Sequence, residues 1–173
     1  MNQAAINEPV AVPEFKVVGP EHAHALARFF ERLQAQGGEK FFHPHPLTAD
    51  EAHQRAVYQG RDFYCVLMLG DTVFGYGMLR GWDEGYEIPS IGVVVDLSVR
   101  GRGYGRSLMK FLRATARQRG VTRLRATVHP ENVKMVAYCR SQGYVFQGLE
   151  NGRLVGFRPL DPPVGASPDE MAR

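Results

Sequence analysis

The chain has 173 residues, of which 44% are hydrophobic and 10% aromatic, so it is long enough and apolar enough for one domain with a buried core. The net charge of +3 is too small to indicate a nucleic-acid-binding protein, and two cysteines, Cys65 and Cys139, cannot form a disulfide framework or a cysteine-rich zinc site. The longest apolar run, residues 63–69, is far shorter than the roughly 20 residues of a membrane span, and the N-terminus has no signal-peptide pattern. We therefore expect a soluble, cytoplasmic protein without a metal site.

The two ends of the chain differ from its middle. Residues 1–13 contain Pro9 and Pro13 and show no periodicity, so we interpret them as a flexible leader. Residues 161–173 are rich in proline, alanine and acidic residues, which is typical of a disordered tail. The predicted domain is therefore 14–160.

The first half of the domain is predicted to hold a strand, two helices and a hairpin. These are a strand at 15–18, helices at 20–36 and 48–59, and paired strands at 63–69 and 73–80. Thr48 is a candidate N-cap because Glu51 follows three residues later. Two prolines exclude regular structure in the connection at 41–46, FFHPHP.

The second half begins with a long predicted strand, 87–95, which is almost continuously apolar from Ile91 and should be buried on both faces. The helix predicted at 105–118 has one apolar stripe, and its opposite face is basic and includes Arg113. The remaining predicted elements are a strand at 121–128, a helix at 132–141 and paired strands at 144–148 and 153–158. This order predicts an α/β (α+β) fold with one mixed, mostly antiparallel sheet of six to seven strands and helices on both faces.

The connection between the long strand and the helix after it carries the chemical signal. It holds three glycines and three arginines: Gly101, Gly103, Gly105, Arg100, Arg102 and Arg106. Glycines allow tight turns and close approach of a ligand, and the free N–H groups and dipole at a helix start attract anions. Residues 97–130 contain no acidic residue and nine basic ones, so we expect a ligand with several phosphates.

Two common phosphate-binding sites do not fit this sequence. A Walker loop requires G-x-x-x-x-G-K-[ST], which is absent. The glycine spacing is G-x-G-x-G rather than the dinucleotide pattern G-x-G-x-x-G, and no acidic residue follows about 20 residues later to hold a ribose.

The segment Arg100–Gly105, RGRGYG, resembles the (Arg/Gln)-x-x-Gly-x-(Gly/Ala) pyrophosphate loop of the GNAT superfamily of N-acetyltransferases. Further along, HPENVKMVAYCRSQGY resembles the second signature of that family, which begins at Asn132. The resemblance covers about residues 15–158 and implies an acetyl-CoA-dependent N-acetyltransferase.

The resemblance also implies roles for individual residues. The strand before the loop should separate from its neighbour and pair its exposed backbone groups with the pantetheine arm. The loop amides should bind the pyrophosphate, and the asparagine should contact the arm. The expected cofactor-binding residues are Val93, Val94, Val95, Arg100, Gly101, Arg102, Gly103, Tyr104, Gly105, Arg106 and Asn132. The acceptor amine should then attack the thioester directly in a ternary complex, helped by positioning and by a backbone N–H at the oxyanion.

One position departs from the family pattern. The family's usual general acid is a Tyr seven residues after the Asn, and here that position holds Cys139, with Tyr138 one place earlier. Three alternatives stay open: Cys139 protonates the leaving thiolate, Tyr138 does so from a shifted helix, or no side chain is needed. Glu87, at the start of the central strand, is either the base that accepts the amine proton through water or a solvated carboxylate.

The acceptor is the least determined part of the prediction. The FFHPHP loop favours a small-molecule amine such as an amino sugar. Phe42, His43 or His45 of this loop either contacts the acceptor or packs on the surface. Trp82 either lines the acceptor site or caps the sheet edge. The alternatives are a protein N-terminal or lysine acetyltransferase, a non-catalytic CoA-binding module, and a nucleic-acid-binding domain that uses the basic segment. A homodimer is an open alternative because members of the family are often dimers.

Overall fold

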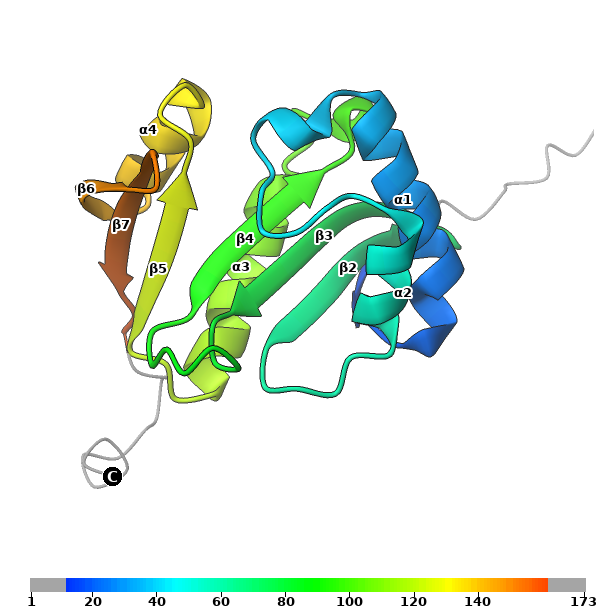
Figure 1. Cartoon of the computed structure of the whole chain (residues 1–173), viewed down its shortest axis with the longest axis horizontal. Coiled ribbons are helices and arrows are strands. Elements are labelled where there is room, and N and C mark those ends of the chain that lie inside the picture. The colour runs from blue at the N-terminus through cyan, green and yellow to red at the C-terminus, as the bar shows by residue number, and fades with distance from the viewer. Residues whose placement is uncertain (1–11, 162–173) are drawn as a thin grey trace, which may run out of the picture.

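A seven-stranded sheet forms the centre of the protein in a computed structural model that describes residues 12–161 (Figure 1). The strands are β1 (Pro13–Val17), β2 (Phe63–Leu69), β3 (Thr72–Arg80), β4 (Ser90–Val95), β5 (Arg123–Val128), β6 (Val145–Glu150) and β7 (Arg153–Pro159), in the spatial order β1-β2-β3-β4-β5-β7-β6. β4 and β5 pair in parallel and the other neighbours pair antiparallel, which confirms the predicted mixed sheet. The predicted leader and tail lie almost wholly outside the described residues, and Pro13 already belongs to β1.

Four α-helices cover the two faces of the sheet. They are α1 (Ala23–Ala35), α2 (Ala49–Ala56), α3 (Tyr104–Gln118) and α4 (Val133–Ser141), with short 3-10 turns at Pro20–His22, Gly38–Lys40 and Leu97–Val99. None of the helices in the described range is long and apolar enough to cross a membrane.

Side chains that alternate along the central strands fill two separate cores. On one face Tyr76 and Met78 of β3 pack with α1 and α2. On the other face Leu79 of β3 packs with α3 and α4, and β3 places Gly75 and Gly77 under the side chains of α3. The period of two along a strand therefore divides the protein into an α1/α2 side and an α3/α4 side.

The start of α2 matches the sequence pattern, but its end does not. Thr48 caps α2 by accepting a hydrogen bond from the Glu51 N–H at 3.2 Å. The helix ends at Ala56 rather than near residue 59, and beyond its end the Tyr58 hydroxyl accepts a hydrogen bond from the Asp62 N–H.

Three further details of the sequence prediction are wrong. The central strand begins at Ser90 rather than Glu87, because Pro89 has no N–H for the strand pairing. Its residues are only partly buried on average, because little of β4 pairs with β5. Arg113 was expected on the exposed face of α3 but is 7% exposed, and it donates a hydrogen bond to Gln142, the C-cap residue of α4, at 3.1 Å.

Candidate functional site

The central sheet is split between β4 and β5. The two strands share one register pair, Ser90 with Arg125, beside which the Arg125 N–H donates to the Pro89 carbonyl at 3.0 Å. Beyond this pair the strands separate toward their carboxyl ends, as Figure 1 shows. We call the unpaired stretch, Gly92–Val95 of β4 opposite Ala126–Val128 of β5, the β4–β5 split.

Backbone polar groups of β4 face this split. Pro89 directs its carbonyl toward β5, whereas the Asp96 N–H donates to the Phe74 carbonyl on the other side at 2.9 Å. Because backbone groups alternate in direction along a strand, Val93 and Val95 direct their N–H and C=O groups toward β5, and Val94 directs its own toward β3. An extended ligand in the split can therefore pair with Val93 and Val95.

The loop between β4 and α3 has the backbone of an anion site. Gly101 and Gly103 have φ angles of 81° and 86°, which L side chains rarely adopt, and Gly103 is the N-cap of α3 without a side-chain cap. A Cβ atom added at either glycine would meet nothing within 4 Å. The N–H groups of the first turn, including those of Tyr104 and Gly105, thus remain free for a ligand.

Positive charge surrounds this helix start. Arg100, Arg102 and Arg106 are all exposed, and no hydrogen bond or ion pair with another described residue engages their guanidinium groups. The sequence-predicted phosphate-binding residues are thereby brought together at one end of the split.

Asp96 fixes the start of the same loop. Its carboxylate accepts hydrogen bonds from Ser98, from Arg32 of α1 at 3.0 Å and from Gln36 at 3.3 Å. Burial alone would raise the pKa of Asp96, but the hydrogen bonds, first those from Ser98, outweigh it and lower the pKa to about 2. The carboxylate therefore stays charged and ties α1 to the loop.

Asn132 and Tyr138 lie on α4, which borders the split from the other half of the sheet. Asn132 is the N-cap, and its Oδ1 accepts from the Met135 N–H at 3.3 Å. Tyr138 shares a flank of the helix with Gln142, which contacts Arg113 of α3, so this flank faces α3. The Tyr138 hydroxyl is buried and has no hydrogen-bond partner among the described residues, as is also true of Tyr144 Oη and Arg158 Nη1.

Cys139 occupies a different environment from its neighbour. It is 2% exposed and lies in the core between α4 and the sheet, where burial raises the pKa of its thiol to about 11. Cys65 is fully buried in β2, and burial raises the pKa of its thiol to about 12. Neither cysteine therefore presents a thiolate to a ligand at neutral pH.

The connection between α1 and α2 reaches across the split on the α1/α2 side. The Phe41 ring lies 5.6 Å from the ring of His129, which follows β5, and the His43 ring lies 6.1 Å from it. Lys40 Nζ also lies 3.8 Å from a Glu131 carboxylate oxygen. Partial burial and then the charge of Arg153 lower the pKa of His43, which favours the neutral imidazole.

Phe42 and His45 of the same loop point inward. Phe42 is buried, and the His45 side chain is 4% exposed, with Nε2 3.1 Å from the Tyr76 hydroxyl and Nδ1 2.8 Å from the Pro46 carbonyl. Burial lowers the pKa of His45. These two residues anchor the loop, and His43 is the one of the three predicted contact residues that is exposed.

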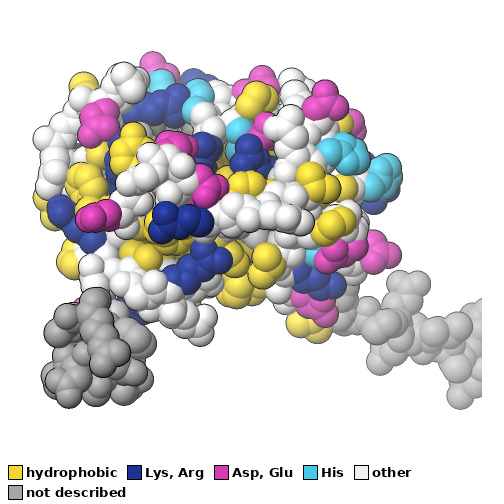
Figure 2. Space-filling model, turned by 60° about the horizontal axis from the view of Figure 1, so that its bottom comes forward, with side chains coloured by type: hydrophobic (Ala, Val, Ile, Leu, Met, Phe, Trp, Pro, Cys, Tyr) yellow, Lys and Arg dark blue, Asp and Glu magenta, His cyan; other side chains and the backbone are white. Residues whose placement is uncertain are grey.

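Glu87 lies away from the loop, at the opposite end of the sheet. It lines a cavity of about 360 Å³ between the β3–β4 and α3–β5 connections, together with Trp82 and Arg119. Figure 2 brings this end forward and shows basic side chains gathered near its centre beside hydrophobic ones. The Trp82 ring is buried and lies under the guanidinium of Arg119, 5.3 Å away. Within residues 12–161, no group of three or more His, Cys, Asp or Glu side chains could hold a metal ion.

Comparison with known families decides the identity of this arrangement. The family model described as the acetyltransferase (GNAT) family matches residues 26–144, which is well over half of the chain. The chain belongs to the GNAT acetyltransferase family. It is therefore an acetyl-CoA-dependent N-acetyltransferase, and acetyl-CoA is its co-substrate.

Solved GNAT structures share the whole fold. The chain is similar to the GNAT domain of S. lividans PAT, with 22% identity and a TM-score of 0.72 over 86% of this chain and 90% of that one. An acetyltransferase from Thermus thermophilus has 25% identity and a TM-score of 0.68, over 87% and 99% of the two chains. The PaiA N-acetyltransferase of Thermoplasma acidophilum, solved with coenzyme A, has 9% identity and a TM-score of 0.68 over 86% and 99%. No curated protein sequence matches the chain.

Sequence reasoning missed several residues of this GNAT domain. His129 and Arg125 belong to β5 and its end, and both gain their position only through contacts with distant parts of the chain. The signal for Asp96 was present, because an acidic residue at the end of a strand and two before a serine is typical of a turn cap.

Proposed function

We propose that this GNAT enzyme acetylates the primary amine of a small molecule by direct attack on acetyl-CoA in a ternary complex. The observation that carries the proposal is the contact of Phe41 and His43 with His129. It closes over the β4–β5 split on the α1/α2 side, which suits a compact acceptor better than an extended peptide. A protein N-terminal or lysine acetyltransferase remains the alternative.

The co-substrate residues follow from the site. Val93 and Val95 would pair with the pantetheine arm, and the α3 N-terminus with its three arginines would hold the pyrophosphate. Val94 would contribute packing rather than pairing, because its backbone faces β3. The free amide nitrogen of Asn132 would contact the arm while its oxygen caps α4.

The acyl transfer needs one proton removed and one supplied. A neutral amine nitrogen attacks the thioester carbonyl carbon, the C–N bond forms, and the C–S bond breaks. The CoA thiolate takes a proton, and the amine releases one to solvent, so the charge balances. Buried, protonated cysteines argue against an acetyl-cysteine intermediate.

We assign the proton donor to Tyr138. Its flank of α4 faces α3, and its buried hydroxyl has no hydrogen-bond partner among the described residues. Because an unpaired buried hydroxyl costs free energy, a bound thioester sulfur would supply the missing hydrogen-bond acceptor. Cys139 stays the alternative, as does transfer without a side-chain acid. Glu87 lies just before β4 and lines a cavity with Trp82 and Arg119, and its role as the base that accepts the amine proton through water stays a prediction. The cytoplasmic location and the homodimer remain predictions.

Binding of acetyl-CoA tests the phosphate site. Arg102→Glu places a carboxylate beside the pyrophosphate. We expect it to weaken acetyl-CoA binding, measured by calorimetry, by about 10-fold or more, because the loss of one charge-assisted hydrogen bond costs roughly 1.5–3 kcal/mol. The matched control is Arg28→Glu, an exposed arginine on α1. Equal affinity in the two variants would refute the loop assignment, and failure of the wild type to bind acetyl-CoA would refute the proposed function.

A further inference from the structure

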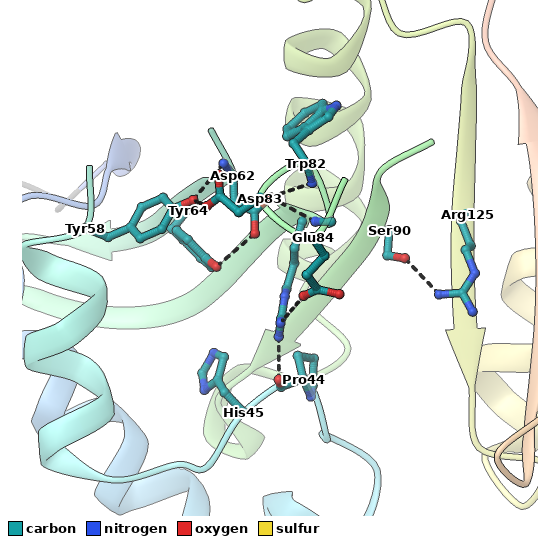
Figure 3. Close-up of polar contacts among 12 residues, drawn as sticks. Pro44, His45, Tyr58, Asp62, Tyr64, Trp82, Asp83, Glu84, Ser90 and Arg125 are labelled. Carbon is teal, nitrogen blue, oxygen red and sulfur yellow. Dashed lines mark hydrogen bonds and ion pairs between the residues drawn. The ribbon is translucent and has the colours of Figure 1, made fainter. Parts of the chain in front are cut away.

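A row of polar side chains crosses β3, β4 and β5 at the single register pair between β4 and β5. Arg80 of β3 pairs in register with Ser90 of β4, and Ser90 pairs with Arg125 of β5. Residues in register share a face of the sheet, and Arg80 follows Tyr76 and Met78 at a period of two, so the row lies on the α1/α2 side. Figure 3 shows Ser90 and Arg125 meeting across the two strands. We call these three residues the Arg–Ser–Arg row.

Each guanidinium group of the row donates a hydrogen bond to a neighbouring oxygen atom. Arg125 Nη1 donates to Ser90 Oγ at 3.2 Å, and Arg80 Nη1 donates to the Pro44 carbonyl. The two arginine side chains are 24% and 28% exposed, so their positions are fixed by packing while part of each remains open to solvent.

Each arginine also has one carboxylate partner, from the β3–β4 connection for Arg80 and from the end of β6 for Arg125. Glu84 lies 3.0 Å from Arg80, and Glu150 lies 2.6 Å from Arg125. These glutamate side chains are 53% and 60% exposed, and ion pairs this exposed contribute only about 0–1 kcal/mol. A guanidinium has five N–H donors, of which the contacts above use two in each arginine. A ligand carboxylate can therefore bind beside the glutamates or displace them at little cost.

The row lies next to the place of reaction. The proposed arm of acetyl-CoA runs along Val93 and Val95 from the phosphate loop, so its thioester end lies toward the Ser90–Arg125 pair. Successive residues on one face of a strand are about 7 Å apart. A ligand held by Arg125 would thus reach the split with an amine only a few bonds away from its carboxylate.

We propose that the Arg–Ser–Arg row binds the carboxylate of the acceptor, and that the acceptor is a small zwitterionic amine of the amino-acid class. This inference rests on the proposed function and names its substrate class. The free N–H groups of Arg125 can donate to the carboxylate, and Arg80 adds positive charge on the same face of the sheet. The exposed Glu84 and Glu150 attract the ammonium form before it loses its proton. The near-neutral sum of these charges fits a zwitterion better than a polyamine or a simple anion.

Matched acceptors test the proposal. The probes are an α-amino acid, its carboxamide and the corresponding amine without the carboxylate, compared by release of CoA thiol. We expect the wild type to favour the acid by about 10-fold or more in kcat/KM, since a charge-assisted pair contributes roughly 1.5–3 kcal/mol. Arg125→Met should lower kcat/KM for the acid by about 10-fold or more and thereby remove its preference over the carboxamide.

A second variant keeps the test independent of folding. Glu150→Gln changes an exposed side chain and frees Arg125 from its partner, so KM for the acid should fall by about 3-fold and KM for the carboxamide should not change. Arg28→Gln serves as the control without effect. Equal use of acid and carboxamide by the wild type, or equal losses for both in Arg125→Met, would overturn the proposal.

Acetyl-CoA affinity separates this inference from the proposed function. The Arg125 and Glu150 variants should bind acetyl-CoA as the wild type does. If the wild type does not bind acetyl-CoA, the function fails, and the row is then tested by the thermal shift that the amino acid produces: an upward shift that Arg125→Met abolishes supports the row, and no shift refutes it.

Discussion

Two adjacent residues on α4 show what a sequence motif leaves open at the scale of single residues. Counting along the motif leads to Cys139, but the side chain of Cys139 points into the core, whereas Tyr138 lies on the flank toward α3. Counting gives a position on a helix, and only the packing of the helix gives the direction of each side chain. The glycines and arginines of the phosphate loop were predictable, because backbone conformation and local charge depend on neighbours in sequence.

Paired substitutions on α4 distinguish the three alternatives for the acid. We expect Tyr138→Phe to lower kcat by about 100-fold with little change in KM, because positioned acids contribute roughly 10²–10⁴-fold. Cys139→Ala should leave kcat within about 2-fold and lower stability by about 1 kcal/mol, as for a small buried side chain.

The reverse pattern, with the loss of kcat in Cys139→Ala, would assign the acid to Cys139. Wild-type turnover in both variants would mean that the CoA thiolate leaves without a side-chain acid. Circular dichroism of each variant serves as the control for folding.

At the scale of elements, local patterns predicted the order of helices and strands, and tertiary contacts set their limits. The apolar stripe of α3 was correct because it reflects packing on the sheet, but it carries no information about the contact of Arg113 with Gln142 at the end of α4. The strand β4 was predicted to be longer and more buried than it is. Its apolar side chains pack in the two cores, but they do not show that most of the strand has no partner on the β5 side. The contact of the α1–α2 loop with His129 joins segments far apart in sequence and has no local signature.

The link between α1 and the phosphate loop predicts a response to acid. The pKa of Asp96 is lowered to about 2 in the folded state, so its contribution to stability is complete above the unfolded pKa near 4 and is lost as the pH falls from about 4 to about 2. The lost free energy of unfolding is about 2 kcal/mol. Urea unfolding of the wild type and Asp96→Asn as a function of pH should show this difference above pH 4 and its disappearance near pH 2.

Asp71→Asn, an exposed residue of the β2–β3 turn, is the matched control and should keep the wild-type profile. A constant difference between the wild type and Asp96→Asn across the whole pH range would show that the carboxylate charge is not what holds α1 to the loop.

At the scale of the whole molecule, the sheet is continuous in its order of strands but not in its hydrogen bonds. One register pair joins the half made of β1–β4 to the half made of β5–β7, and a hydrogen bond from Arg113 of α3 to Gln142 at the C-cap of α4 also links them. The family resemblance in the sequence predicted this separation. No residue pattern in β4 or β5 alone distinguishes strands that pair from strands that part.

Hydrogen exchange measures this feature directly. The amides of Val93 and Val95 should exchange at least about 10-fold faster than those of Gly92 and Val94, which donate toward β3, although all four lie in the central strand. Acetyl-CoA should slow the first pair and leave the second nearly unchanged. Equal protection of all four amides in the free protein would contradict the backbone directions deduced for β4.

The single pair between β4 and β5 also ties the lifetime of the protein to its substrate. When the pantetheine arm binds in the β4–β5 split, the sheet gains the equivalent of an additional strand. A ligand at 100 times its Kd adds about 2.7 kcal/mol to the free energy of unfolding. The unfolded fraction, on which proteases act, would then fall by about 100-fold. A cell depleted of coenzyme A would lose this enzyme by degradation as well as by lack of substrate, so its abundance would follow the supply of acetyl groups.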